Sequence, residues 1–192
     1  MTNHAVFLDR DGTLNVDSGY LGEPDKVQLF PEVGEALSLL KNDHRFLLIV
    51  VSNQSGVARG LITKDQVDSV NSRINILLSE FNVVIDAFYY CPFHPDFSDQ
   101  KSVKCRKPSP EMILNAAKDF NIDLSKSYLV GDSVSDILCG INASVKTILV
   151  QTGEGKDSLS ILHNDNNFPS FVAENILDAA NFIIKDFSGV NN

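Results

Sequence analysis

The sequence predicts an α/β protein built on a doubly wound parallel sheet. Short apolar runs rich in β-branched residues recur along the 192-residue chain, and each run is nearly continuous in hydrophobicity. This pattern is typical of strands that are buried on both faces of a parallel sheet. Segments with helical spacing lie between the runs, and such an alternation of strands and helices favours a sheet covered by helices.

A local signal places each element. The strand candidates are the apolar runs at 5–8, 46–51, 83–90, 127–130 and 147–150, with a short further strand at 171–172. The helix candidates open on a proline or a capping residue, or they carry apolar residues three and four positions apart. They are the segments 31–41, 63–80, 110–120, 134–141 and 173–187.

The chain length suits one well-formed core and is short for two. We therefore expect a single domain over residues 1–187 and a frayed tail at 188–192. The one long stretch without periodicity is 91–109. Loops of that length in a compact domain are more often functional than idle.

Charge and composition exclude several classes of protein. The net charge of −9 argues against electrostatic binding to nucleic acid or to an anionic membrane. No apolar run approaches the ~20 residues of a membrane helix, and the first residues lack the pattern of a signal peptide. Three cysteines form no even-numbered disulfide framework. We expect a monomeric protein in a reducing, cytoplasmic setting.

Polar side chains gather at four of the expected strand or loop ends. In open α/β sheets, ligands bind beyond the carboxyl ends of the strands. A turn at Gly12 could bring the two carboxylates after the first strand together. The groups are Asp9 and Asp11 after the first strand, Ser52 to Ser55 after the second, Arg106 and Lys107 closing the long loop, and Asp132, Ser133 and Asp136 after the fourth strand.

These ends together offer carboxylates for a hard cation, cations for an anion and neutral donors for phosphate oxygens. Phosphoryl transfer needs all three, because the charge on the transferred group must be neutralised. Carboxylates alone would repel a phosphorylated substrate, whereas Mg²⁺ can bridge them to a phosphate oxygen. The pattern therefore favours a magnesium-dependent reaction on a phosphate.

Taken singly, each group also has a plainer interpretation. Asp9 and Asp11 could be solvated turn residues, and Asp132 and Asp136 could cap a helix. The run at 52–55 could be an ordinary polar turn. Arg106 and Lys107 could be a solvated pair of charges. Only the combination of all four groups favours one site.

Four motifs resemble those of the haloacid-dehalogenase-like (HAD) phosphatases. FLDRDGTLN, VSNQ, RKP and GDSVSD match that family's motifs in order, over nearly the whole chain. DRDGTLN…GYL, SNQSGVARG and CRKP-x-P-x-M further resemble the branch of D,D-heptose 1,7-bisphosphate and histidinol-phosphate phosphatases. The resemblance implies the Rossmann-like HAD fold and a phosphatase that forms an aspartyl-phosphate.

The resemblance also implies a role for each motif residue. Asp9 would attack phosphorus, and Asp11 would protonate the leaving oxygen and then activate water. Asp9, the backbone carbonyl of Asp11, and Asp132 would hold Mg²⁺. Ser52 and Lys107 would bind the transferred phosphoryl group.

Further residues of the branch are implied around these. Asp136 would orient its neighbours. Arg106 would be both a catalytic residue and a contact to the substrate beyond the reacting phosphate. The remaining substrate contacts would come from Asp17, Ser18, Gly19, Tyr20, Asn53, Gln54, Ser55, Lys107 and Ser133.

Many members of the branch hold a structural zinc with C-x-H and C-x-C ligands in the loop after the third strand. In this chain, Phe93 and Val103 stand where the histidine and one cysteine would be. Only Cys91 and Cys105 remain in register, although His94 could shift to give a third ligand, and structural zinc normally has four protein ligands. We therefore expect no zinc, and ordinary thiols at both cysteines.

No separate cap domain is expected. The interval from Asp9 to Ser52 holds a turn, one helix and one strand, and the loop 91–109 is too short for a domain. An open site suits a substrate that carries its own charge for recognition.

The resemblance to this branch implies, as the favoured function, removal of the 7-phosphate of D-glycero-D-manno-heptose 1,7-bisphosphate, a step toward ADP-heptose and the lipopolysaccharide core. Three alternatives stay open: a histidinol-phosphate phosphatase, a phosphotransferase or mutase, and a non-catalytic module that binds a phosphorylated ligand.

Overall fold

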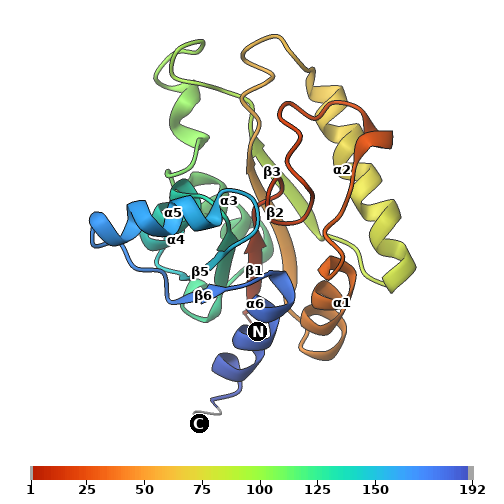
Figure 1. Ribbon diagram of the computed structural model, residues 1–192, viewed down its shortest axis with the longest axis vertical. Helices are drawn as coiled ribbons and strands as arrows, with labels where there is room; N and C mark the ends of the chain where they lie inside the picture. Colours follow the sequence, from red (N-terminus) through yellow and green to blue (C-terminus); the bar gives the residue numbers. More distant parts are fainter. Residues whose placement is uncertain (1, 190–192) are drawn as a thin grey trace.

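Six parallel strands form one sheet in the computed structural model, which describes residues 2–189 (Figure 1). Their order in space is β3-β2-β1-β4-β5-β6. The chain starts in the middle of the sheet, runs outward to β3 and returns to β4, so the winding direction changes between β1 and β4. The strands are β1 (Ala5–Leu8), β2 (Leu47–Asn53), β3 (Ala87–Cys91), β4 (Tyr128–Gly131), β5 (Lys146–Val150) and β6 (Phe171–Ala173).

Helices cover both faces of the sheet. The helices are α1 (Val33–Ser38), α2 (Lys64–Leu78), α3 (Glu111–Phe120), α4 (Val134–Ala143), α5 (Gly155–Asn164) and α6 (Ile176–Phe187). Residues of α1, α2 and α6 share one apolar cluster with the sheet, and residues of α3 and α4 share the other. Shorter helical turns lie at Pro24–Lys26, Leu39–Asp43, Ser79–Phe81, Ser102–Cys105 and Leu124–Lys126.

Strand β1 explains why the apolar runs are continuous. Val6 and Leu8 belong to one apolar cluster, and Ala5 and Phe7 belong to the other. Successive side chains of a strand point to opposite faces, so a strand covered on both faces must be apolar at every position. All four β1 residues are buried. The predicted fold class is confirmed, and no separate cap domain is present in the described residues.

Strand β3 begins later than the run 83–90 predicts. Val83 and Ile85 are buried but lie outside the ladder, because Ile85 N–H donates to the side chain of Asn75. Asp86 accepts the backbone N–H of Leu48, so pairing with β2 begins only after it. Burial without pairing made these residues resemble a strand in the sequence.

Helix α5 was not predicted. Its first residue is Gly155, a poor helix former, and few of its residues are apolar. The glycine is needed for close packing, because a Cβ there would lie 1.8 Å from the carbonyl oxygen of Val150. Leu162 fixes the helix to the core beside Ile137 of α4 and Leu149 of β5.

Two further features concern the ends of the chain and the membrane. Of the tail expected at 188–192, residues 190–192 lie outside the described part of the chain. Among residues 2–189, no helix combines the length and the apolar character needed to cross a membrane.

Candidate active site

The turn after β1 brings its carboxylates to the centre of the sheet edge. Asp9 N–H donates to Val130 of β4, and Gly12 N–H donates to the carbonyl of Asn15 and closes the turn. Gly12 has a φ of +85°, and a Cβ there would lie 2.2 Å from Asp132 Oδ2. Glycine at this position therefore permits both the left-handed turn and the close approach of Asp132.

A second loop encloses Asp132 from the opposite side. Glu154 N–H donates to Asp132 Oδ2 at 2.8 Å, and Thr152 Oγ1 donates to the carbonyl of Gly12 at 2.7 Å. Gly153 has a φ of +52°, and its Cβ would lie 2.0 Å from Asp132 Oδ2. The loop between β5 and α5 is thus part of the site, a contribution that the sequence interpretation missed. Two closely spaced glycines after a strand, Gly153 and Gly155, are its only signal in the sequence.

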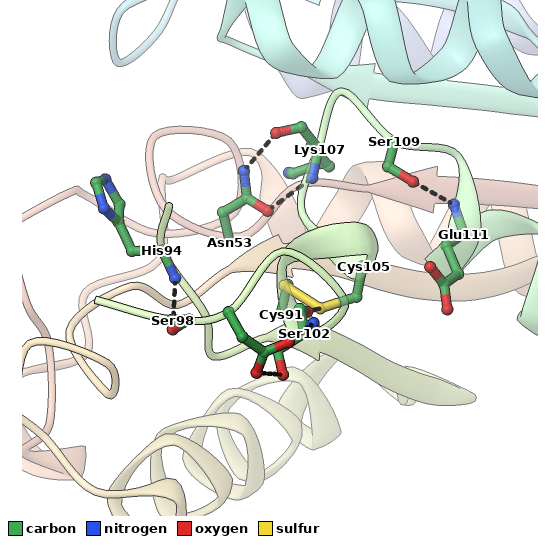
Figure 2. Close-up of a disulfide and its surroundings, with 10 residues drawn as sticks. Asn53, Cys91, His94, Ser98, Ser102, Cys105, Lys107, Ser109 and Glu111 are labelled. Atoms are coloured by element: carbon green, nitrogen blue, oxygen red, sulfur yellow. Dashed lines mark hydrogen bonds between the residues drawn. A yellow bond between two sulfur atoms is a disulfide. The ribbon is translucent and has the colours of Figure 1, made fainter. Parts of the chain in front are cut away.

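Lys107 connects the carboxylates. Its Nζ donates to Asp9 Oδ1 at 2.6 Å and to the carbonyl of Val51 at 2.8 Å, and it lies 2.5 Å from Asp136 Oδ1. The side chain of Asn53 holds the backbone of Lys107 from both sides, with distances of 3.0 Å to its N–H and 3.2 Å to its carbonyl oxygen (Figure 2). Asn53 lines the cleft, but its amide group fixes the lysine.

Asp136 uses both of its carboxylate oxygens within the protein. Oδ1 is paired with Lys107, and Oδ2 accepts from the N–H and the hydroxyl of Ser133 in a capping box at the start of α4. Oxygens of Asp9, Asp132 and Asp136 all lie within 4.8 Å of one another. This acidic cluster could bind a metal ion. Asp136 is the least suitable of the three as a ligand, because its oxygens already have partners.

The charges at the site are unbalanced. Burial and the nearby Asp136 raise the pKa of Asp9 well above its usual range, although Lys107 opposes this shift. Burial also raises the pKa of Asp132 to about 6. For Lys107, burial lowers the pKa, but Asp136 and Asp9 outweigh it and hold the pKa above the usual range. One ammonium group therefore faces three buried carboxylates, which leaves an excess of negative charge for a cation to neutralise.

Gln54 holds two of the expected catalytic side chains. Its Nε2 donates to Ser52 Oγ at 2.7 Å and to Asp11 Oδ2 at 2.8 Å. Ser52 and Gln54 are both buried. The run at 52–55 therefore contacts the carboxylate of Asp11 directly. It was expected to follow the second strand as a polar turn, but Ser52 and Asn53 are the last two residues of β2.

These groups line one cleft with a volume of about 470 Å³. Of the sequence-predicted residues, Ser18 and Asp136 do not form its wall, although Asp136 lies behind Lys107. Ser135 and Glu154 line the cleft and were not predicted. The wall consists of Asp9, Asp11, Asp17, Gly19, Tyr20, Ser52, Asn53, Gln54, Ser55, Arg106, Lys107, Asp132, Ser133, Ser135 and Glu154.

The loop after β3 corrects one expectation. Cys91 and Cys105 form a disulfide, whereas the sequence interpretation expected thiols (Figure 2). Counting three cysteines could not show that two of them meet once the loop folds back on β3. The bond ties the end of β3 to the turn just before Arg106 and Lys107. Cys139 is the free cysteine, and it is buried.

The other loop residues have specific partners. His94 Nε2 lies 3.1 Å from Arg59 Nη2, and the guanidinium of Arg59 stacks 4.8 Å above the ring of Phe97. Phe93 packs against the core, whereas the side chain of Phe97 is exposed.

Burial and the nearby Arg59 lower the pKa of Arg106, which faces the cleft.

Comparison with known proteins identifies the family. A family model described as HAD-hydrolase-like matches residues 104–179. A D-glycero-β-D-manno-heptose-1,7-bisphosphate 7-phosphatase of Haemophilus ducreyi is 45% identical over 80% of this chain and 86% of its own length. The enzyme of the same name from Pasteurella multocida is 41% identical over 93% of this chain and 96% of its own. The chain belongs to this family of HAD-like phosphatases.

A solved structure of the family matches in three dimensions. It is a D,D-heptose 1,7-bisphosphate phosphatase from B. bronchiseptica, complexed with magnesium and phosphate. Its TM-score is 0.84 at 30% sequence identity, over 95% of this chain and 99% of that one. The expected family and its phosphatase activity are thereby confirmed.

Proposed function

We propose that this chain removes the 7-phosphate of D-glycero-D-manno-heptose 1,7-bisphosphate through an aspartyl-phosphate at Asp9, with Mg²⁺ bound. The observation that carries the proposal is the position of Asp9. It lies at the end of β1, bonded to Lys107 and beside Asp132, in the cleft that also holds Asp11. The substrates named for the family's similar members support the choice of sugar.

The charge of the site fits Mg²⁺. Carboxylate and carbonyl oxygens are the ligands that this ion prefers, and the buried acidic cluster exceeds the one ammonium group that contacts it. Asp9, Asp132 and the backbone carbonyl of Asp11 would hold the ion. When bound, it would neutralise charge on the transferred phosphoryl group.

The residues of the chain then divide the reaction between them. A carboxylate oxygen of Asp9 attacks phosphorus, the bond from phosphorus to the sugar oxygen breaks, and Asp11 gives that oxygen a proton. Water then attacks phosphorus, Asp11 accepts its proton, and the bond from Asp9 to phosphorus breaks. Lys107 and Ser52 hold the oxygens of the transferred group throughout.

The second phosphate of the substrate would meet Arg106. This guanidinium faces the cleft, and one of its buried nitrogens has no hydrogen-bond partner among the described residues. An anion would satisfy it. The proposed contacts to the sugar are the cleft-lining residues Asp17, Gly19, Tyr20, Ser55 and Ser133. Ser18, which was expected among them, does not line the cleft.

The test is phosphate release by the purified protein with MgCl₂. We expect kcat/KM for heptose 1,7-bisphosphate to exceed that for histidinol phosphate by roughly 10²-fold or more, because only the bisphosphate satisfies Arg106. Arg106→Met should remove most of this preference, and Lys104→Met, at an exposed lysine two positions away, serves as the control. Equal or reversed preference in the wild type would overturn the substrate assignment.

The proposed setting is the cytoplasm, where the chain would act as a monomer on a small phosphorylated sugar. Thiol-reducing systems keep most cysteines reduced there. The Cys91–Cys105 disulfide would then be open in the cell and closed in oxidising solution.

The acidic cluster also predicts a pH dependence for the metal-free protein. The pKa of Asp132 is raised to about 6, so the folded state binds its proton more tightly than the unfolded state does. We therefore expect the unfolding free energy to fall as the pH rises from about 4 to 6, with Asp132 contributing at most about 3 kcal/mol. Denaturant titrations in chelator should show this slope reduced in Asp132→Asn. An unchanged slope in that variant would contradict the charge assignment.

A further inference from the structure

Arg10, the residue between the two aspartates of the first motif, is a buried cation beside the active site. Its side chain is 1% exposed. Its guanidinium is directed at the neighbouring Asp11: Nη2 lies 2.6 Å from Oδ2, and Nε lies 3.1 Å from each carboxylate oxygen. Burying an arginine costs free energy unless its charge is paired, and the carboxylate of Asp11 provides that pairing.

Helix α2 holds the other side of the guanidinium. Arg10 Nη1 donates to Asn71 Oδ1 at 3.4 Å. Asn71 is buried, on a face of α2 whose other buried residues are Val67, Val70, Ile74 and Leu78. A polar residue among these apolar ones needs a partner, and Arg10 provides it. Asn71 therefore links the orientation of Arg10 to the packing of α2 on the sheet.

The carboxylate of Asp11 is held from three directions. Besides Arg10, Asn15 Nδ2 donates to its Oδ1 at 3.0 Å, and Gln54 Nε2 donates to its Oδ2 at 2.8 Å. Arg10 is the charged member of this set and contacts both oxygens. A planar guanidinium that meets both oxygens fixes the plane of a carboxylate, which a lysine ammonium does not do.

We propose that Arg10 is a positioning residue for the acid–base step: it sets the orientation of the Asp11 carboxylate, and Asn71 sets the orientation of Arg10. This inference rests on the proposed role of Asp11. A general acid must lie within hydrogen-bond reach of the oxygen that it protonates, so a small rotation of the carboxylate reduces proton transfer. Asp9 is not held by Arg10, and its attack on phosphorus needs no contribution from it.

The test separates leaving groups that need a proton from those that do not. Arg10→Lys keeps the positive charge but lacks the planar guanidinium that contacts both oxygens of Asp11. Asn71→Leu keeps the side-chain volume but removes the hydrogen bond to Arg10. Arg73→Lys, two positions further along α2, is the matched control. The rate at which the alcohol or phenol leaves, as Asp9 attacks phosphorus, is measured by rapid mixing with excess enzyme. The measurement is made once with an alkyl phosphate and once with 2,4-dinitrophenyl phosphate.

We expect Arg10→Lys to slow release of the alkyl alcohol by about 10- to 100-fold, part of the 10²- to 10⁴-fold that a general acid contributes. Release of dinitrophenol should change less than about threefold, because this anion leaves without a proton. Asn71→Leu should show the same selective pattern with a smaller size: slower release of the alkyl alcohol, and nearly unchanged release of dinitrophenol. This variant tests the inference even if Arg10→Lys does not fold. Equal losses for both leaving groups, or no loss in either variant, would overturn it.

The result is independent of the sugar assignment. The heptose bisphosphate serves as the alkyl phosphate if the wild type cleaves it, and otherwise any alkyl phosphate that the wild type does cleave takes its place. Failure on the heptose substrate would thus count against the proposed function. An unchanged ratio between alkyl and aryl rates would count against the role of Arg10.

Discussion

Replacing Asp9 by asparagine should abolish turnover and, at the same time, stabilise the metal-free protein. We expect phosphate release to fall by about 10⁴-fold or more, because the variant lacks the nucleophile. The free energy of unfolding should rise by roughly 0.5–2 kcal/mol, a common range for single stabilising substitutions. The reason is the crowding of Asp9, Asp132 and Asp136 around the single ammonium of Lys107.

Steady-state kinetics with MgCl₂ and denaturant titrations in chelator measure the two effects. Asp165→Asn, at an exposed position after α5, controls for the loss of one negative charge. Substantial turnover by Asp9→Asn would contradict its role as nucleophile. If Asp9→Asn lowers the free energy of unfolding by more than Asp165→Asn does, the carboxylates of the metal-free site do not repel one another as we expect.

Replacing Lys107 by methionine should reduce both activity and stability. Its ammonium contacts Asp9, Asp136 and the carbonyl of Val51, and its side chain is 2% exposed. Removing one member of a buried ion pair typically costs 3–5 kcal/mol, because the partner charges stay buried. We expect a loss of this size in chelator and a fall in kcat of about 10²- to 10³-fold for a lost electrostatic contact to the phosphoryl group.

Lys104→Met is the control for this substitution, because Lys104 is exposed and lies three positions earlier. The double variant Asp9→Asn, Lys107→Met provides a sharper check. It should be more stable than Lys107→Met alone, since one of the two uncompensated carboxylates is gone. If the changes in unfolding free energy of the two single variants simply add up in the double variant, the two side chains do not interact, contrary to what their 2.6 Å contact implies.

The elements that the sequence predicted correctly are those whose signal is local. Strand β1 is apolar at every position because both faces are covered, and α2 opens with Thr63 and Gln66 in a capping box. Helix α5 was missed because Gly155, required by the nearby carbonyl of Val150, weakens its helical pattern. Packing across the fold decided that position, and packing is not visible in a window of sequence.

The same division holds at the active site. The motif residues Asp9, Asp11, Lys107 and Asp132 could be named from strand ends and family resemblance, and they line one cleft. The groups that support them depend on contacts over long separations in sequence. Arg10 meets Asn71 of α2, and the disulfide partner of Cys91 is Cys105, across the loop after β3. The spacing of residues along the sequence does not predict such pairs.

The most direct test of the aspartyl-phosphate is to trap it. Asp11→Asn should form the intermediate from a dinitrophenyl phosphate and hydrolyse it slowly, because the base that activates water is missing. After acid quench, reduction with borohydride and digestion, mass spectrometry should find the conversion of aspartate to homoserine at position 9. Conversion at another carboxylate, or none at all while dinitrophenol is released in a burst, would contradict the assignment of Asp9 as the nucleophile.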